Sequence, residues 1–485
     1  MPDTSKMKTN PHEHSHAQNR LAVIPTSEKL GASPQYSGRG IRIAFIDSGF
    51  YPHPDFTDRV IAVHDVSGKE SFLSEFDEPK GHHWHGTQTV VSCAGNGSLS
   101  DGIYRGIAHK SELVLVKVSS DGKINDESIV KGLEWVIANQ SKLKIRIVNI
   151  SLGGDCDQPS SESPINQLIE NLAGLGVVAT VAAGNSSDGS SMPPASAPSA
   201  ITVGGYSDEN QFDPADFDLY HSNFGITSDG IIKPEVIAPA MFVAAPILPG
   251  TVDYKTAEIL SLLANSPDYL FRKNYLDNWR DAGLPEHILS TDVATARQFV
   301  EDELSRRKIV ATHYQHVDGT SFAAPITASV VAQMLEANPD LTPHAVKNIL
   351  LSTAEKISGR PAIRQGFGVL NAKCAVDLAE SEDHDLRPGI FGPPRVERKR
   401  IVFHLHDDSA ESSRLVGDFN DWDEDNLPFS RNGNGVWTAA IPCQPAGRYR
   451  YKFLIDAERW IEDATHGFKE EDGFGGFNSI LVIGG

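Results

Sequence analysis

Short apolar, β-branched segments alternate with helical patterns over residues 25–380, and this alternation constrains the fold more than any other feature of the sequence. Near-continuous apolar runs are typical of strands that are buried on both faces of a parallel sheet. The stretches between them, such as 127–142 and 163–176, have the spacing of amphipathic helices. This alternation predicts a doubly wound α/β domain. The predicted strands are 41–47, 60–66, 113–120, 145–152, 177–184, 200–205 and 234–240.

The rest of the chain divides into four parts by composition. Residues 1–24 are polar and predict a disordered tail. Residues 251–312 are mostly helical in composition and predict an insertion, which could cover a site, restrict its substrates, engage a partner or lie far from it. Residues 381–398 are charged and contain Pro and Gly, so we expect a linker there. Residues 399–485 contain short strands and turns, and they predict a small all-β sandwich.

The composition argues against several classes of function. The net charge is 43 − 64 = −21, and such an acidic chain is a poor candidate for binding nucleic acid or anionic lipid. No apolar run approaches the roughly 18 residues that suggest a membrane span. The N-terminus shows no signal-peptide pattern, and the four cysteines are too scattered for a disulfide framework. We therefore expect a soluble, cytoplasmic protein.

Three residues of the types used in nucleophilic catalysis stand at the ends of predicted elements. Asp47 closes a strand, His85 begins a helical segment and Ser321 enters another. A serine hydroxyl needs a base to take its proton, and an imidazole base needs a carboxylate to orient it. Each residue alone also has a structural explanation, as a turn former or helix cap. Pro325 is expected in the first turn of the Ser321 helix, where proline is tolerated.

Two more segments fall at the carboxyl ends of predicted strands, where open parallel sheets bind their ligands. Asn185 follows an apolar strand, and an Asn amide in that position can donate hydrogen bonds to an oxyanion. The Ser-Leu-Gly-Gly sequence at 151–154 ends another strand. Together with Asp47, these segments predict a site at this edge of the sheet.

The motifs IDSG, HGT, SLGG, AAGN and GTSFAAP, in this order, closely resemble those of subtilisin-like serine endopeptidases over roughly residues 25–380. The resemblance implies a subtilisin-like fold and hydrolysis of peptide bonds through an acyl-enzyme. It implies that Asp47, His85 and Ser321 form the charge-relay triad, with Asn185 as the oxyanion donor. The substrate-cleft residues that it implies are Ser151, Leu152 and Gly153.

Two details qualify this resemblance. Residues 88–91 read QTVV, where the family often has a second His and an Ala-Gly pair. The triad requires no cofactor, but Asp55 resembles a calcium-ligand position of some subtilisins. Oxygen atoms from the loop at 95–102 could complete a structural calcium site there.

The segments LVGDFNDW, GVWTAAI, GRYRYKFLID, RWIEDA and FNSILVI resemble the glycogen-binding module of AMP-activated kinase β subunits and branching enzymes. Flat indoles can stack on the apolar faces of sugars, although tryptophans in such strands can equally belong to the core. The resemblance implies glucan contacts by Trp422, Lys452, Trp460 and Asn478. Many relatives of this module have structural or interaction roles instead, so both roles stay open.

We therefore expect a cytoplasmic serine endopeptidase that acts on protein or peptide substrates. Its C-terminal module is expected to direct it to an α-glucan such as glycogen, or to a partner protein. The alternative is a glucan-binding or interaction scaffold whose protease domain is latent or acts only in self-processing. Nucleic acid and membranes are not expected among its partners.

Overall fold

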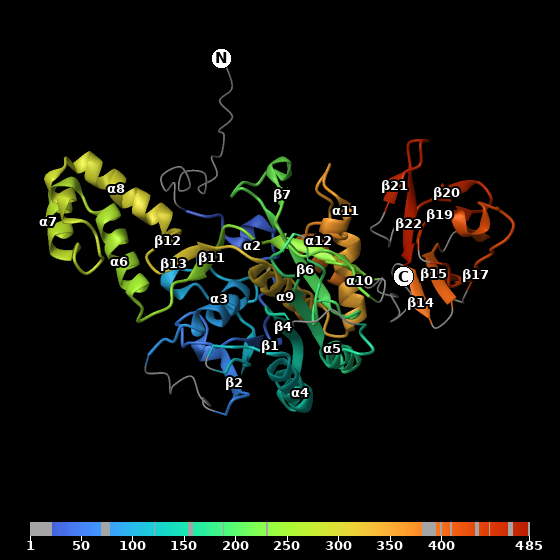
Figure 1. The fold of residues 1–485 in the computed structure, drawn as a ribbon, viewed down its shortest axis with the longest axis horizontal. Helices are drawn as coiled ribbons and strands as arrows, with labels where there is room; N and C mark the ends of the chain where they lie inside the picture. Colours follow the sequence, from blue (N-terminus) through green and yellow to red (C-terminus); the bar gives the residue numbers. More distant parts are fainter. Residues whose placement is uncertain are drawn as a thin grey trace, which may run out of the picture.

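The computed structural model has an α/β body, with a helical insertion at one end and a β domain at the other (Figure 1). It describes residues 22–68, 78–120, 122–153, 159–187, 189–228, 231–380, 394–397, 400–407, 410–431, 436–445, 447–463 and 469–483. Within those ranges, no helix combines the length and the apolar character needed to cross a lipid bilayer.

The central sheet has the strand order β10-β6-β5-β4-β1-β3-β2, and every neighbouring pair on this path is parallel. A short strand, β7 (Asp218–Leu219), adds an antiparallel pair to β6. The parallel strands match the seven apolar runs of the sequence, which confirms the predicted α/β class. They are β1 (Arg42–Asp47), β2 (Val60–Asp65), β3 (Glu112–Lys117), β4 (Ile145–Ile150), β5 (Val178–Ala182), β6 (Ile201–Ser207) and β10 (Val236–Pro239).

The direction in which strands are added reverses between β1 and β4. Strands β3 and β2 lie on one side of β1, whereas β4, β5, β6 and β10 lie on the other. Such a reversal opens a crevice beyond the carboxyl ends of the two strands, where ligands bind in folds of this type. Asp47 is the last residue of β1 and Ser151 directly follows β4, so both lie at this crevice.

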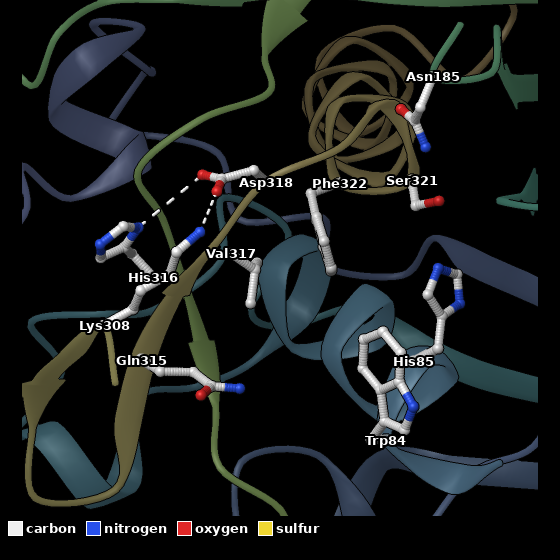
Figure 2. Close-up of a pocket in the computed structure, with 10 residues that line it drawn as sticks. All are labelled: Trp84, His85, Asn185, Lys308, Gln315, His316, Val317, Asp318, Ser321 and Phe322. Carbon is white, nitrogen blue, oxygen red and sulfur yellow. Dashed lines mark hydrogen bonds and ion pairs between the residues drawn. The ribbon is translucent and has the colours of Figure 1, made fainter. Parts of the chain in front are cut away.

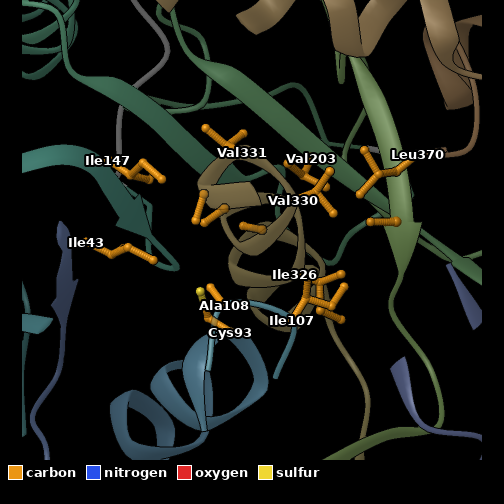
Figure 3. Close-up of a cluster of buried hydrophobic side chains, with 14 of the residues drawn as sticks. Ile43, Cys93, Ile107, Ala108, Ile147, Val203, Ile326, Val330, Val331 and Leu370 are labelled. Atoms are coloured by element: carbon orange, nitrogen blue, oxygen red, sulfur yellow. The ribbon is translucent and has the colours of Figure 1, made fainter. Parts of the chain in front are cut away.

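Helices cover both faces of the sheet, and each face has its own apolar core. One face is covered by α3 (His83–Ala94), α9 (Thr320–Ala337), α10 (Pro343–Thr353) and α12 (Ala372–Glu380), and the other by α4 (Asp126–Leu143) and α5 (Pro164–Gly174). Helix α9 is central, with 15 of its 18 residues buried. Ile326 and Val330 pack in the same cluster as Ile43, Ile147 and Val203 from the sheet (Figure 3).

The predicted insertion forms a small helical unit with a core of its own. Leu260, Phe271 and Val300 lie at the centre of this core. The chain then returns to the α/β body through a three-stranded antiparallel sheet with the order β11-β13-β12. These elements are α6 (Val252–Asn265), α7 (Asp268–Asn278), α8 (Val293–Arg306), β11 (Val243–Pro246), β12 (Ile309–Ala311) and β13 (Tyr314–Val317).

The C-terminal domain consists of two antiparallel sheets that enclose one apolar core, as predicted for a β-sandwich. One sheet contains β14 (Arg395–Glu397), β15 (Arg400–His406), β18 (Val436–Pro442) and β17 (Ser430–Arg431). The other contains β16 (Ser413–Gly417), β19 (Gly447–Ile455), β22 (Phe477–Ile483), β21 (Lys469–Glu471) and β20 (Arg459–Ile461). Further short α-helices and strands in the described ranges are α2 (Thr26–Lys29), β8 (Gly225–Ile226), β9 (Ile232–Lys233) and α11 (Ala362–Gln365).

Two predicted boundaries need correction. Val23 is buried, and the Ile24 N–H donates to the Asn210 side chain at 2.8 Å, so the end of the predicted tail 1–24 packs on the α/β body. The predicted linker 381–398 contains β14, which pairs with β15. A three-residue edge strand with two charged residues is easily mistaken for a linker, because charges are common on edge strands. Residues 1–21 and 381–393 lie outside the described ranges.

The return strand of the insertion is tied to the α/β body by a buried hydrogen bond. The Tyr314 hydroxyl donates to Asp55 Oδ2 at 2.7 Å, and the Ser98 hydroxyl donates to Oδ1 at 2.8 Å. Tyr314 and Asp55 are both 0 % exposed. A buried carboxylate that loses a donor is costly, so we expect this bond to stabilise the junction between insertion and body.

Replacing Tyr314 with Phe should lower the free energy of unfolding by about 1–3 kcal/mol, because a buried carboxylate then lacks one of its donors. The measurement is urea denaturation followed by tryptophan fluorescence. Tyr36→Phe is the matched control, because it removes a tyrosine–carboxylate hydrogen bond, to Glu380, at the surface. Equal effects of the two substitutions would contradict the importance of the buried bond.

Candidate active site

Asp47 and His85 are hydrogen-bonded at the crevice of the sheet. The Asp47 carboxylate is buried and lies 2.8 Å from His85 Nδ1. It also accepts hydrogen bonds from the Ser48 N–H at 2.7 Å and from the Thr89 hydroxyl at 3.2 Å. Because Nδ1 of the imidazole faces Asp47, Nε2 is the nitrogen that is left to act as a base.

Helix α3 carries His85 in its first turn, and its close approach to β1 depends on Gly86. A Cβ atom on Gly86 would lie 2.3 Å from the Gly49 carbonyl oxygen, closer than any side chain could tolerate. Thr89 lies four residues after His85, on the same face of the helix, and therefore reaches the same carboxylate. Of the residues that depart from the family pattern, Gln88 is buried and donates to the Pro246 carbonyl at 2.9 Å.

The environment of His85 favours the charged imidazolium. Burial alone would lower its pKa, but the charge and the hydrogen bond of Asp47 outweigh burial and raise the pKa of His85 above 6.5. A base with a raised pKa holds a proton more readily once it has taken it from a nucleophile. The pair is therefore suited to general-base chemistry near neutral pH.

Ser321 lies at the amino end of α9, beside His85 and Asn185 (Figure 2). The helix starts abruptly because Gly319 has a φ of 138°, a conformation that L side chains rarely adopt. The Ser321 hydroxyl donates to the Ser151 carbonyl at 3.4 Å. At a helix amino end, the free N–H groups and the helix dipole favour negative charge.

Pro325 is the sixth residue of α9, so the prediction that it lies in the first turn is wrong. Its missing N–H leaves the Ser321 carbonyl without the usual donor four residues later. The Ser151 hydroxyl supplies a hydrogen bond to this carbonyl at 2.9 Å, and the Asn149 amide in turn donates to Ser151 at 3.0 Å. The proline thus creates the acceptor through which β4 holds the Ser321 backbone.

Asn185 is oriented by the residue that precedes Ser321. Its amide oxygen accepts hydrogen bonds from the Thr320 N–H at 2.9 Å and from the Thr320 hydroxyl at 3.0 Å. Because the oxygen is engaged by two donors, the amide NH₂ group is left to face the cavity beside Ser321 (Figure 2). This arrangement can donate to an oxyanion.

The segment after β4 offers an open backbone edge next to Ser321. Ser151 is buried, Leu152 packs partly against the core below the sheet, and Gly153 is exposed. A Cβ atom on Gly153 would meet no atom within 4 Å. An extended peptide can add to such an edge as a further strand. Gly154 lies outside the described residues.

A cavity of about 370 Å³ adjoins these groups, and His85, Asn185 and Ser321 all line it. Its other wall includes Lys308 and the strand β13, which belong to the return path of the insertion (Figure 2). The return strand of the insertion therefore contributes to the rim of the site, so the insertion does not lie wholly far from it.

The residues around Asp55 do not fit a calcium ion. Both carboxylate oxygens accept hydrogen bonds from hydroxyl groups, those of Tyr314 and Ser98. In the loop at 95–102, the Gly97 carbonyl already accepts hydrogen bonds from the N–H groups of Ser100 and Gly102. Over the described part of the chain, no group of three or more His, Cys, Asp or Glu side chains could hold a metal ion.

In the C-terminal domain, the four predicted glucan contacts come from one sheet and an adjoining loop. Trp460 lies opposite Leu454 of β19. Tyr451 lies opposite Ser479, so the next residues of these two strands, Lys452 and Asn478, are level with each other. Because side chains alternate along a strand, Lys452, Asn478 and Trp460 share one face of the sheet. The rings of Trp422 and Trp460 are 6.3 Å apart. Trp460 is 40 % exposed, whereas Lys452 and Asn478 are each 8 % exposed.

Polar contacts fix this group of side chains in place. The Trp422 indole N–H donates to Asp418 at 2.9 Å, and Asp418 also accepts hydrogen bonds from Arg450. Lys452 forms an ion pair with Asp472. Trp437, in contrast, is buried in the core of the sandwich, which is the alternative role that the sequence allowed for tryptophans in these strands. Two aromatic rings beside fixed polar groups can bind a sugar face and its hydroxyls.

Several contributors to the site were not singled out from the sequence. Thr89 could have been found from its helical spacing to His85. The Thr320 hydroxyl has its role because it donates to the Asn185 amide, and the Ser151 hydroxyl because Pro325 leaves the Ser321 carbonyl without a helical donor. Neither contact can be predicted from the periodicity of the sequence. Lys308 reaches the cavity only because the insertion folds back on the body.

Comparisons with known proteins agree with this geometry. The model of the Subtilase family matches residues 38–369, and that of Carbohydrate-binding module 48 (Isoamylase N-terminal domain) matches residues 390–466. Serine protease AprX of Bacillus subtilis is 30% identical over 373 residues, which cover 75% of this chain and 70% of that protein. The Major intracellular serine protease of Bacillus subtilis is 29% identical over 178 residues, 34% of this chain and 51% of that protein.

A solved structure supports the fold. Fervidolysin from Fervidobacterium pennivorans, described as a keratinolytic enzyme related to subtilisin, has a TM-score of 0.50 and 18% sequence identity. The alignment covers 88% of this chain and 55% of fervidolysin, so the chain spans about half of that structure. At this identity the likeness bears on the architecture alone.

Hydrolysis should depend on pH through His85. With neutral His85 as the general base, kcat/KM should be highest above the raised pKa of His85 and should fall as the pH drops through that pKa. Asp47→Asn leaves only the effect of burial, so the acidic limb should move to lower pH, with a rate loss of about 10⁴-fold. Rates of labelling by a fluorophosphonate between pH 5 and 9 measure this. Asp58→Asn, a surface change, should leave the pH–rate profile unaltered. If the acidic limb of the profile did not move in Asp47→Asn, the pairing of Asp47 with His85 as the base would be contradicted.

Thr320→Val should reduce kcat by roughly tenfold with little change in KM, because the Asn185 amide loses one of the two donors that orient it. The measurement is steady-state peptide hydrolysis in single and double variants with Asn185→Ala. In the Asn185→Ala background we expect almost no further loss. Thr327→Val, which removes a hydroxyl bonded to the Ala323 carbonyl in the same helix, is the control. An undiminished Thr320→Val effect without Asn185 would disprove the coupling.

Proposed function

We propose that this chain, which belongs to the subtilase family of serine proteases, cleaves proteins while its C-terminal module is bound to an α-glucan. One observation carries the catalytic part: the hydrogen-bonded pair of Asp47 and His85 adjoins the same cavity as Ser321 and Asn185. The family assigns the class of reaction, serine endopeptidase. The roles of the individual residues and the identity of the glucan are our proposal.

Ser321 is the nucleophile and His85 the general base. As a peptide enters, the Ser321 hydroxyl exchanges its long hydrogen bond to the Ser151 carbonyl for one to His85 Nε2. The oxygen then attacks the scissile carbonyl while His85 takes the proton, and Asp47 stabilises the resulting imidazolium. His85 returns this proton to the leaving amine, which yields an acyl-enzyme. Water, activated by the same base, hydrolyses the ester.

The negative charge of each tetrahedral intermediate is stabilised by two donors. One is the Asn185 amide, which Thr320 holds in the required orientation. The other is the backbone N–H of Ser321, at the amino end of α9. Both donors are fixed before the substrate arrives, so little reorganisation is needed during the reaction.

The peptide on the acyl side of the scissile bond lies along Ser151, Leu152 and Gly153. Backbone pairing with this open edge holds an extended chain without selecting its sequence. Because the edge follows β4 directly, and Ser151 is hydrogen-bonded to the Ser321 carbonyl, the substrate and the nucleophile are positioned by the same strand. Folded proteins therefore need a locally extended segment in order to be cut.

The C-terminal module binds an α-glucan such as glycogen through the face that carries Trp422 and Trp460. The two rings, 36° from coplanar, suit a curved chain of sugars better than a flat one. Lys452 and Asn478 supply polar groups beside them. Carbohydrate binding is the property named for this module, and the glucan is our proposal.

The cytoplasm is the compartment we propose. Cys374 is an exposed free thiol and Cys93 is a buried one, and exposed thiols persist best in a reducing compartment. One of the relatives, 29% identical, is named as an intracellular protease. Cys156 lies outside the described residues.

Co-sedimentation with glycogen, followed by an assay of labelled casein, tests both halves of the proposal. The unmodified chain should sediment with its activity. The double variant Trp422→Ala/Trp460→Ala should keep its activity in solution. Its affinity for glycogen should fall by about tenfold or more, because two stacking rings are lost. Ser321→Ala should sediment but cleave nothing and resist a fluorophosphonate probe. Phe212→Ala, an exposed aromatic of the protease domain, is the matched control for retention.

The outcomes separate the alternatives. Failure of the unmodified chain to sediment would contradict glucan binding and leave an interaction role for the module. Labelling of Ser321→Ala would contradict the choice of nucleophile. Intact casein beside a self-trimmed N-terminus would contradict the digestion of other proteins and favour a latent protease that acts only on itself.

A further inference from the structure

The chemistry of acyl transfer fixes which part of a substrate lies next to the 370 Å³ cavity. His85 must give its proton to the amine that leaves, so the residue after the scissile bond lies beside His85. The cavity is lined by His85, by Trp84 before it and by Phe322 after the nucleophile, and none of Ser151, Leu152 and Gly153 lines it. It therefore receives the leaving-group side of the peptide.

The far wall of this cavity carries several hydrogen-bond donors. Lys308, Gln315 and His316 contribute an ammonium, an amide and an imidazole (Figure 2). Lys308 is held in place, because its carbonyl accepts the His316 N–H at 2.8 Å. Its φ is 57°, a left-handed conformation that glycine would adopt with less strain. Lys308 adopts this conformation in the turn between α8 and β12, which brings it to the wall of the cavity.

Asp318, the one acidic residue among the described residues that line the cavity, already has partners for both carboxylate oxygens. One oxygen forms an ion pair with Lys308, and the other accepts the Phe242 N–H at 3.3 Å and lies 3.8 Å from His316 Nδ1. Burial would raise the pKa of Asp318, but His316 and Lys308 outweigh it and lower the pKa to about 2. The Lys308 side chain is 48% exposed and that of Asp318 only 22%, so the positive partner is the more accessible one.

We infer that this cavity binds an acidic side chain directly after the scissile bond, with Lys308 as the residue that determines this specificity. The inference rests on the proposed proteolytic function and deepens it. The aliphatic part of a glutamate contacts Trp84 and Phe322, and its carboxylate meets the ammonium of Lys308. A lysine in the same position would face a like charge.

Peptide hydrolysis by the full chain tests this inference. A cleaved sequence is first identified in casein by mass spectrometry, and its acyl half is kept constant in a series of quenched fluorescent peptides. The first residue after the bond is Glu, Gln, Leu or Lys. We expect kcat/KM for Glu to exceed that for Lys by about tenfold, with Gln between them. The ratio should shrink as salt is raised from 20 mM to about 1 M, because the pair is partly exposed.

Variants assign the effect to Lys308. Lys308→Met should lower the rate for Glu to that for Gln or below it, because Asp318 then loses its ion-pair partner. Lys308→Glu should favour the Lys peptide, and Lys308→Arg should retain the original order. Each variant is judged by the ratio of its rates for the Glu, Gln and Lys peptides, so a uniform change in activity, which a p-nitroanilide of the same acyl half reports, does not affect the comparison. Equal rates for Glu and Lys in the unmodified chain, or a Glu preference that survives Lys308→Met, would overturn the inference. Failure of the unmodified chain to hydrolyse the anilide would instead count against the proposed function.

Discussion

The parallel pairing of β1 with β4 is the constraint on which the rest of the structure depends. Ile46 lies opposite Ile150 in this register, so Asp47 and Ser151 leave the sheet side by side. Because side chains alternate between the faces of a strand, a slip of one residue would turn the Asp47 carboxylate away from α3. The crevice at this point then receives the amino end of α9, whose burial on nearly all sides prevents it from shifting.

Much of this arrangement could be predicted from the sequence. Apolar runs gave the strands of the sheet, since strands covered on both faces admit few polar residues, and Asp47 stood out as the charge that ends such a run. Interactions between side chains and the backbone were harder to foresee. The Thr320 hydroxyl matters because of an amide 135 residues away, and the Ser151 hydroxyl because Pro325 removes a donor. Pro325 was itself misplaced by one turn, because the start of the helix depends on the geometry at Gly319.

The insertion shows the same limit on a larger scale. Its composition predicted helices, and these form with a separate core around Phe271. Nothing in local periodicity revealed that the chain returns through β13 and brings Lys308 to the cavity. Long-range antiparallel pairing of this kind depends on the whole fold, as does the pairing of Tyr314 with Asp55. Such contacts join the helical insertion to the α/β body, whose strands could be predicted from their apolar runs.

The orientation of Asn185 also has a bearing on how this protein would age. Deamidation that yields aspartate would convert the amide into a carboxylate of nearly the same shape. One oxygen could still accept the two hydrogen bonds from Thr320, so the fold would survive. The other oxygen would then stand as a negative charge where the side-chain donor had been, opposed to the charge that develops on the substrate. The loss of one ammonia would thus leave a folded chain that is expected to bind peptides but to hydrolyse them far more slowly.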